Sequence, residues 1–195
     1  MPTATPPAPA APGPTPLNYD RSAAFFLHSH PRDPRHDHAY DRSGTCFRAT
    51  AALFTPIIEP VAIPYEGTTL PGYLYRADTT GVPRPTLIMH SGFDGTAEEL
   101  HLGGALAAVE PGCTVLTFDG PGQPGPRHHQ GMVFRPDREN VTTPVVDFAE
   151  TIPSFQVNPR RWRRRPWQRS HRPVCKSTQS RRARPSTGVM TGTRP

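Results

Sequence analysis

The sequence predicts an α/β fold with N-terminal helices, a partial mixed sheet and disordered ends. Three consecutive patterns support this prediction. The apolar run Leu87–Met89 is typical of a strand buried on both faces of a parallel sheet. The helical pattern Thr96–Val109 follows, and Pro111-Gly112 ends it before a second apolar run at Cys113–Phe118. A strand, a helix and a strand joined by short connections predict a right-handed parallel crossover.

The crossover helix has its own start signal. Thr96 can cap the helix, and Glu98 and Glu99 lie in its first turn, where the positive end of the helix dipole favours acidic side chains. The turn His90-Ser91-Gly92 precedes this helix. Free backbone N–H groups are therefore expected at the carboxyl edge of the sheet, where they can stabilise negative charge on a phosphate or an oxyanion.

Two helical patterns precede the crossover, at Tyr19–His30 and Asp37–Phe54, with a break at Pro31–Pro34. They predict a small N-terminal helical layer. The apolar positions of the first pattern are Ala23, Phe25, Phe26 and Leu27.

A β-hairpin is predicted after these helices. Glu59–Tyr65 and Leu70–Tyr75 alternate between apolar and polar residues around the turn Glu66-Gly67-Thr68. Beyond the second buried strand, Asp119–Gly125 is expected to be a rigid, tight loop, and Asn140–Thr151 has one more helical pattern.

The composition divides the chain into a body and two unusual ends. Seven of the 27 prolines lie in residues 1–16, which are expected to form a disordered leader. From Arg160 onward there are 12 basic residues and no acidic ones, so the remaining 10 basic and 16 acidic residues give the body a charge of −6. Residues 154–195 are therefore predicted to be a basic, disordered tail.

Eight segments of the body together form a more specific pattern. They resemble the α/β-hydrolase superfamily, in the dipeptidyl-aminopeptidase/acyl-peptidase-like esterase branch that includes 2,6-dihydroxypseudooxynicotine hydrolase and fermentation–respiration-switch-type proteins. The resemblance runs from about residue 17 to about residue 152. The segments are Phe25–His28, Asp33–Arg35, Ala51–Phe54, Ile63–Tyr75, His90–Thr96, Phe118–Gln123, Phe134–Asp137 and Pro144–Phe148.

The resemblance implies a serine hydrolase that transfers acyl groups from small-molecule esters or amides, without a cofactor or a metal. By position it implies that Gly92, Phe93 and Asp94 form one side of the oxyanion hole. The domain division that follows is a helical segment at 17–56 and the first half of the hydrolase domain at 57–153.

The catalytic triad of such an enzyme does not appear in the sequence. The nucleophile belongs in a Gly-x-Ser-x-Gly turn after a strand that follows the Asn140–Thr151 helix, and no such motif occurs in the chain. The expected acid and histidine are absent as well. The sequence therefore predicts a truncated, inactive hydrolase fragment. A change of reading frame near residues 153–159 is one economical explanation of the tail.

Four other positions are candidate site residues with simpler alternatives. His90 is expected to anchor its turn, and Ser91 lacks the context of a nucleophile. Asp119 could be a triad acid, but its place before Gly-Pro-Gly favours a turn carboxylate that accepts backbone N–H groups. His128 and His129 could bind a metal, but they are interpreted as a pair in a loop.

A binding protein is the alternative to a hydrolase. The Arg-rich tail, with Trp162 and Trp167, could neutralise phosphates and stack on bases of a nucleic acid, although solvated tail sequence is favoured. The oligomeric state is left open. Three widely spaced cysteines without a CxxC pair favour a reducing compartment, and no apolar run is long enough to span a membrane. A cytoplasmic location is expected.

Overall fold

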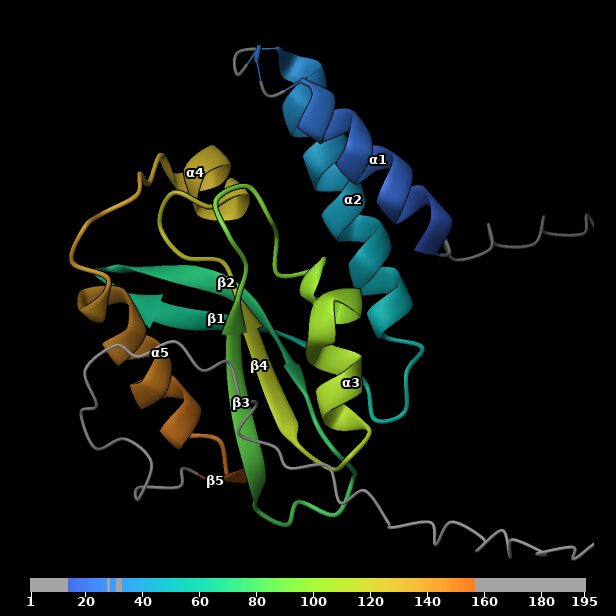
Figure 1. The fold of residues 1–195 in the computed structure, drawn as a ribbon, viewed down its shortest axis with the longest axis vertical. Coiled ribbons are helices and arrows are strands. Elements are labelled where there is room, and N and C mark those ends of the chain that lie inside the picture. Colours follow the sequence, from blue (N-terminus) through green and yellow to red (C-terminus); the bar gives the residue numbers. More distant parts are fainter. Residues whose placement is uncertain (1–13, 28, 31–32, 157–195) are drawn as a thin grey trace, which may run out of the picture.

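The computed structural model describes residues 14–27, 29–30 and 33–156 (Figure 1). The first helix begins at Pro14, inside the predicted leader 1–16, and the last strand lies at Phe155–Gln156, inside the predicted tail 154–195. Residues 157–195, with both tail tryptophans, lie outside the described residues. Among the helices of the described residues, none combines the length and the apolar character needed to cross a membrane.

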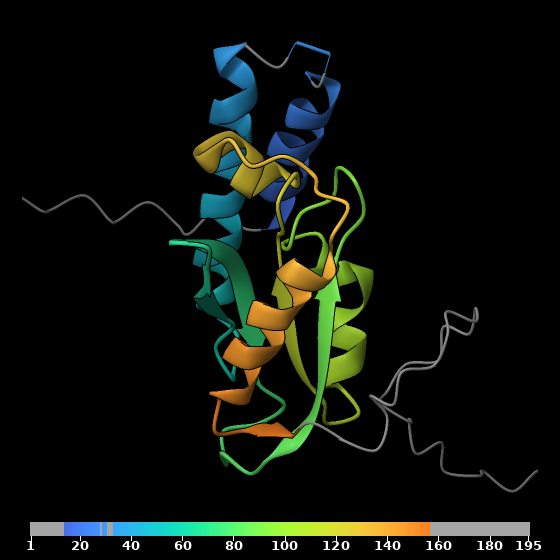
Figure 2. The ribbon, with the colours of Figure 1, turned by 90° about the vertical axis from the view of Figure 1, so that its left-hand side faces the viewer.

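Two helices, α1 (Pro14–Phe26) and α2 (Pro34–Ala51), lie side by side at one end of the molecule (Figures 1 and 2). The predicted helical layer is confirmed, with both helices starting earlier than expected. The start of α2 has a local cause: an Asp33 carboxylate oxygen accepts the Arg35 N–H at 2.9 Å, and Pro34 occupies the first helical position.

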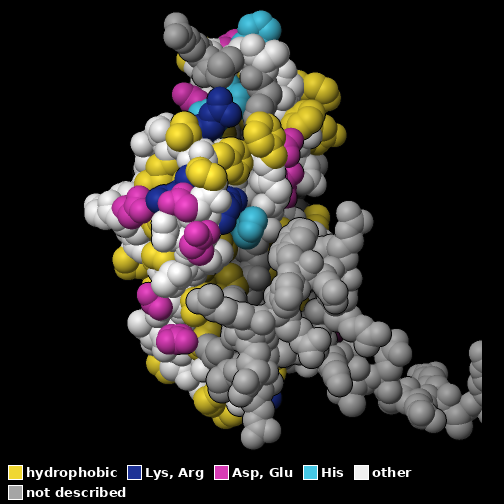
Figure 3. Space-filling view, turned by 60° about the vertical axis from the view of Figure 1, so that its left-hand side comes forward, with side chains coloured by type: hydrophobic (Ala, Val, Ile, Leu, Met, Phe, Trp, Pro, Cys, Tyr) yellow, Lys and Arg dark blue, Asp and Glu magenta, His cyan; other side chains and the backbone are white. Residues whose placement is uncertain are grey.

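The expected apolar face of α1 is only partly buried. Ala24 is buried, whereas Phe25 and Phe26 are 48% and 80% exposed. Among the described residues, α1 packs mainly against α2, so one narrow stripe is enough for this contact and the aromatic side chains face outward. Figure 3 shows hydrophobic side chains gathered toward the helical end of the molecule.

The sheet has the strand order β1-β2-β4-β3-β5. The hairpin strands β1 (Glu59–Tyr65) and β2 (Thr68–Tyr75) pair antiparallel, and β2 pairs antiparallel with β4 (Thr114–Phe118). The strand β3 (Arg84–His90) runs parallel to β4 on one side and to β5 (Phe155–Gln156) on the other. The hairpin and the parallel crossover are thus confirmed.

Helices cover both faces of the sheet (Figures 1 and 2). On one face, Phe47 of α2 packs with Tyr73, Tyr75 and Val115 of the sheet. On the other face, α5 (Glu139–Glu150) contributes Val141, Val145 and Ala149 to a second cluster, with the sheet residues Ile63, Leu70, Leu116 and Phe118. The sheet is therefore the middle layer of three.

The two parallel strands differ in burial. Every residue of β4 is buried, as the sequence predicts, but Leu87, Ile88 and Met89 of β3 are only half-buried. The prediction that β3 is buried on both faces is wrong for the described residues. The cause lies in the sheet order: only Arg84 and Pro85 of β3 pair with β5, so the described chain leaves the outer edge of β3 from Thr86 to His90 without a strand partner.

The crossover helix begins as expected and then departs from regular geometry. The Thr96 hydroxyl accepts the Glu99 N–H at 3.3 Å, and the Glu99 carboxylate accepts the Thr96 N–H at 2.8 Å, which is a capping box. A π-helical turn η1 (His101–Ala105) follows, with Gly104 at φ 149°, before the short helix α3 (Leu106–Val109). The predicted Thr96–Val109 helix is thus kinked at Gly104, whose positive φ is a backbone conformation that only glycine adopts readily.

The segment after β4 differs from its prediction. The tight loop ends at Gln123, and α4 (Pro124–Gln130) follows it, although the sequence favoured a loop there. Proline at the first helical position is compatible with a helix, and Gly131 ends α4 in a left-handed conformation. The helix predicted at Asn140–Thr151 is confirmed as α5, one residue earlier at each end.

The close contact between β2 and β4 predicts an effect of one substitution. A Cβ atom at Gly72 would lie 2.3 Å from the Thr117 carbonyl oxygen, which cannot move without breaking the ladder. We expect Gly72→Ala to lower the free energy of unfolding of the full chain by about 1–3 kcal/mol in urea titrations. Gly103→Ala is the matched control, because the nearest atom to its Cβ lies 3.8 Å away. Equal stability of the two variants would contradict this reason.

Candidate active-site edge

Two loops meet at the carboxyl edge of the parallel strands. In the β3–β4 register His90 lies opposite Phe118, so residues 91–95 and residues 119–123 leave the sheet next to each other. Both strands point toward α4 in Figure 1. Loops at this edge of an open α/β sheet are the usual place for a ligand site.

The Gln123 side chain connects the two loops. Its amide nitrogen donates to the Ser91 carbonyl at 3.0 Å, to the Ser91 hydroxyl at 2.8 Å and to the Gly92 carbonyl at 3.0 Å. Its amide oxygen accepts the Gly120 N–H at 2.6 Å. Gln123 is fully buried, so these contacts satisfy a polar group that would otherwise be costly to bury. The sequence did not predict this role of Gln123, because the adjacent Gly-Pro-Gly indicated only a tight turn.

The clamped loop presents backbone donors. Among the described residues, no acceptor contacts the N–H groups of Gly92, Phe93 or Asp94, and the Gly92 and Phe93 residues are exposed. From the other side, an Arg21 guanidinium nitrogen donates to the Asp94 carbonyl at 2.6 Å. Arg21 also pairs with Glu99 of the capping box at 3.1 Å. The loop is thus held at both ends while the N–H groups between them stay open.

An aromatic pair lies beside these donors. The Phe93 ring stacks on the Phe134 ring at 5.4 Å and 15°, and the Arg138 guanidinium lies over Phe134 at 5.4 Å. This arrangement requires glycine at position 122, where φ is +90° and a Cβ would lie 2.3 Å from the Phe134 ring. Phe93 remains 67% exposed, so one face of the loop offers an apolar contact surface.

His90 and Ser91 have the local roles that the sequence favoured. The His90 ring nitrogen Nδ1 donates to the Ser91 carbonyl at 2.7 Å. The Ser91 hydroxyl is held by Gln123, and within the described residues no imidazole contacts it. Neither residue is therefore placed as a nucleophile and its base.

The Asp119 carboxyl accepts a backbone N–H group, as the sequence favoured, but the donor is Ala97 and not a residue of its own turn. The N–H of the next residue, Gly120, is bound by the Gln123 side chain. Asp119 lies against a cavity of ≈ 320 Å³ whose lining includes Tyr40, Tyr73 and Glu98. Burial, and then the negative charge of Glu98, raise the pKa of the Asp119 carboxyl well above 3.8. The carboxyl is thus a buried acid on the inner side of the loop.

His128 and His129 lie in α4 rather than in a loop, so the interpretation of a loop pair is wrong. His128 contacts Asp37 of α2 at 3.0 Å, and His129 contacts Asp41 of α2 at 3.2 Å. These contacts fix α4, which starts directly after Gln123, against the N-terminal helical layer.

Comparisons with known proteins match this chain to several hydrolases. Hydrolase acrC of Aspergillus aculeatus is 43% identical over 148 residues, which are 69% of this chain and 35% of that protein. The α/β hydrolase psoB of Aspergillus fumigatus is 36% identical over 145 residues, 67% of this chain and 31% of that protein. The 20-hydroxy-prefusarin hydrolase FUS2 of Gibberella moniliformis is 35% identical over 147 residues, 72% of this chain and 35% of that protein. No family model matches the chain.

Among solved structures, the crystal structure of the 2,6-dihydroxy-pseudo-oxynicotine hydrolase shares this fold. It superimposes with a TM-score of 0.56 and 23% identity, over 73% of this chain and 42% of that chain. The chain belongs to the α/β-hydrolase superfamily. It spans about a third of the length of the curated hydrolases that it matches.

In this chain, β5 follows α5, where the sequence analysis expected the strand that leads to the nucleophile. It runs parallel to β3, with Arg84 opposite Phe155. The residues beyond Gln156 lie outside the described part of the chain. Gly92, Phe93 and Asp94 lie together at the carboxyl edge, and their role in an oxyanion hole stays a prediction.

The clamp predicts a specific response to substitution at Gln123. Gln123→Glu turns an amide donor into an acceptor that faces the oxygen atoms of Ser91 and Gly92. We expect a loss of about 1–3 kcal/mol in unfolding free energy and faster hydrogen exchange across residues 91–95.

Gln130→Glu is the matched control, because Gln130 ends the helix α4 that Gln123 precedes, and its amide donates to the Thr69 carbonyl at 2.9 Å from an exposed position. It should change stability by less than about 0.5 kcal/mol. Unaltered exchange of residues 91–95 in folded Gln123→Glu would contradict the clamp.

The raised pKa of Asp119 predicts a pH dependence of stability. The folded chain retains the carboxyl proton that the unfolded chain releases near 3.8, so the stability contributed by the protonated form is present below this pH and is lost as pH rises toward the folded pKa. We therefore expect Asp119→Asn to stabilise the protein more at about pH 7 than at about pH 4 in urea titrations.

Asp147→Asn, which removes an exposed carboxylate of α5, serves as the control. An Asp119→Asn effect that is the same at both pH values would show that Asp119 ionises normally in the fold.

Proposed function

We propose that the described residues form the oxyanion-stabilising half of a serine hydrolase that acts on ester or amide bonds of small molecules. In this proposal residues 17–56 form the helical layer and residues 57–153 the first half of the catalytic domain, in the esterase branch that the sequence resembles. The observation that carries the proposal is the loop at Gly92–Asp94, whose free N–H groups lie at the carboxyl edge of β3 and are held there by Gln123 and Arg21.

The chemistry that suits this loop is acyl transfer. When a nucleophile attacks a carbonyl carbon, negative charge develops on the carbonyl oxygen, and fixed N–H donors stabilise that charge without reorganising. The Gln123 amide holds the backbone of Ser91 and Gly92, so the Phe93 N–H keeps its direction. The stacked rings of Phe93 and Phe134 would contact an apolar acyl or alcohol group of the substrate.

The chain by itself is proposed to be inactive. It contains no Gly-x-Ser-x-Gly sequence, and the Ser91 hydroxyl is bound to Gln123 rather than to a base. Orientation of a nucleophile accounts for a large part of the rate of such enzymes, and an oxyanion loop without a nucleophile lacks that part. The names of the matched relatives support the reaction class, and they leave the substrate of this chain to experiment.

A chimera tests this proposal. Residues 1–156 of this chain are joined to the remaining C-terminal part of the Aspergillus aculeatus hydrolase, and hydrolysis of a p-nitrophenyl ester is measured. We expect no phosphonate-sensitive turnover from the chain alone and measurable turnover from the chimera. In the chimera, Phe93→Pro removes one backbone donor and should lower kcat by about 10²–10³-fold.

Phe93→Ala in the chimera is the control, since it keeps the N–H group and removes the ring. It should mainly raise KM. A Phe93→Pro chimera with unchanged kcat would rule out the oxyanion role, and ester hydrolysis by the chain alone that a serine-directed phosphonate blocks would rule out its inactivity.

A further inference from the structure

A second group of side chains joins α2 to α4, apart from the loop at residues 91–95. Two acidic residues one turn apart on α2, Asp37 and Asp41, face two adjacent histidines of α4. His128 Nδ1 lies 3.0 Å from Asp37 Oδ1, and His129 Nε2 lies 3.2 Å from Asp41 Oδ1. The Tyr40 ring lies between the two pairs, at 5.7 Å from the His128 ring and 5.8 Å from the His129 ring.

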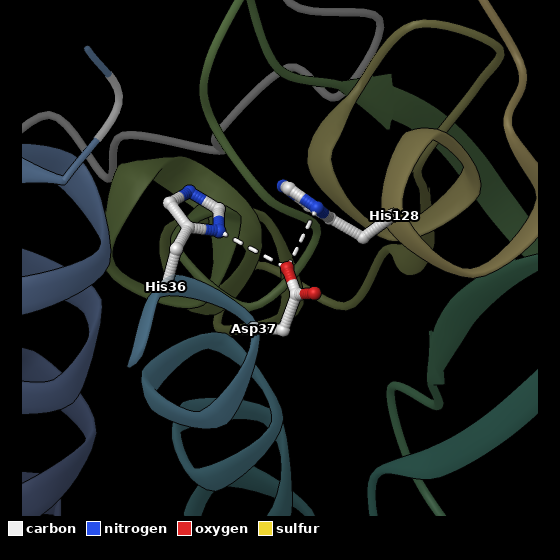
Figure 4. Close-up of side chains that lie close together, drawn as sticks. All are labelled: His36, Asp37 and His128. Atoms are coloured by element: carbon white, nitrogen blue, oxygen red, sulfur yellow. Dashed lines mark hydrogen bonds and ion pairs between the residues drawn. The ribbon is translucent and has the colours of Figure 1, made fainter. Parts of the chain in front are cut away.

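The first of these pairs has a third member. His36 precedes Asp37 in the first turn of α2, and its Nδ1 lies 3.4 Å from the same Oδ1 atom of Asp37. The His36 and His128 rings are 4.3 Å apart. Figure 4 shows both imidazoles directed at the Asp37 carboxylate, and the three donor atoms all lie within 4.8 Å of one another.

The burial of the two histidines and their shared carboxylate oxygen favour a ligand set over two separate surface ion pairs. The side chains of His36 and His128 are only 4% and 14% exposed. A neutral imidazole offers a lone pair on one ring nitrogen, which is the form that binds a metal ion.

We propose that His36, Asp37 and His128 bind a divalent transition metal ion of the Zn²⁺ class. In a tetrahedral zinc shell with bonds near 2.0–2.1 Å, neighbouring donor atoms are about 3.3 Å apart. The two Asp37–histidine distances of 3.0 and 3.4 Å fit this spacing. Two imidazoles and one carboxylate suit Zn²⁺, Co²⁺ or Ni²⁺, whereas Mg²⁺ and Ca²⁺ prefer oxygen ligands.

The position of the cluster indicates what a bound ion does. The Asp37 side chain is 60% exposed, so solvent reaches the carboxylate and can supply the fourth ligand. The ion links the start of α2 to α4, and α4 begins immediately after Gln123. Metal binding therefore braces the segment that clamps the loop at residues 91–95. This role does not depend on the proposed hydrolase activity.

Titration of the full chain with Zn²⁺ by calorimetry tests the site, with Mg²⁺ as the comparison ion. We expect one Zn²⁺ per chain and no heat with Mg²⁺. Asp37→Asn and His128→Gln should each weaken Zn²⁺ binding at least tenfold, because each removes one of three ligands. The matched controls, His129→Gln and His38→Gln, change a histidine beside the cluster and should bind as the wild type does. Circular dichroism of each variant verifies that the helices persist.

A second measurement decides the question without any variant. Co²⁺ bound to the wild-type chain should give visible absorption typical of nitrogen and oxygen ligands. Charge-transfer absorption typical of a cysteine ligand would overturn the proposal. So would wild-type Zn²⁺ affinity in both Asp37→Asn and His128→Gln, or the absence of Zn²⁺ binding at about 1 mM, the weakest affinity of practical meaning.

Discussion

The buried amide of Gln123 is the interaction on which the active-site edge depends. The parallel pairing of β3 and β4 brings two loops to one edge, but pairing alone does not fix their backbones. Gln123 does so by contacting Ser91 and Gly92 of one loop and Gly120 of the other. Because the amide is fully buried, each of these contacts replaces a lost contact with water. The Gln123 contacts occupy carbonyl oxygens of this loop, and within the described residues no acceptor binds the N–H groups of Gly92–Asp94.

The two parallel strands have different neighbours in the described part of the sheet. The strand β4 is buried along its whole length, between β2 and β3. Its neighbour β3 contains the apolar run Leu87–Met89, yet within the described residues only Arg84 and Pro85 are paired on its outer side. The composition of β3 is that of an interior strand. The match to about a third of the length of curated hydrolases agrees with this difference in burial.

Much of the fold could be predicted from local patterns. Three elements have a residue pattern that indicates both the type of element and its buried side. They are the hairpin, with its alternating apolar and polar residues, the apolar strand β4 and the helix α5, with its helical period. The Thr96–Glu99 capping box is equally local. The start of α4 was missed because Pro-Gly-Pro reads as a loop, although proline is favoured at the first turn of a helix.

The side-chain clusters could not be predicted, because they depend on tertiary contacts. The three residues His36, Asp37 and His128 come together only when α4 packs on α2, and their sequence spacing matches no known ligand motif. Gln123 and Ser91 meet only because β3 and β4 are parallel and adjacent. Likewise, the outward position of Phe25 and Phe26 depends on what α1 packs against, which periodicity does not specify.

The clamp lies entirely between Arg21 and Gln123, ahead of the strand that would carry a nucleophile. The residues that hold the loop at 91–95 therefore all precede α4, and they can form these contacts before the rest of the chain has been synthesised. Because every contact of the clamp is made by residues up to Gln123, substitutions after this residue leave the clamp's own hydrogen-bonding groups unchanged.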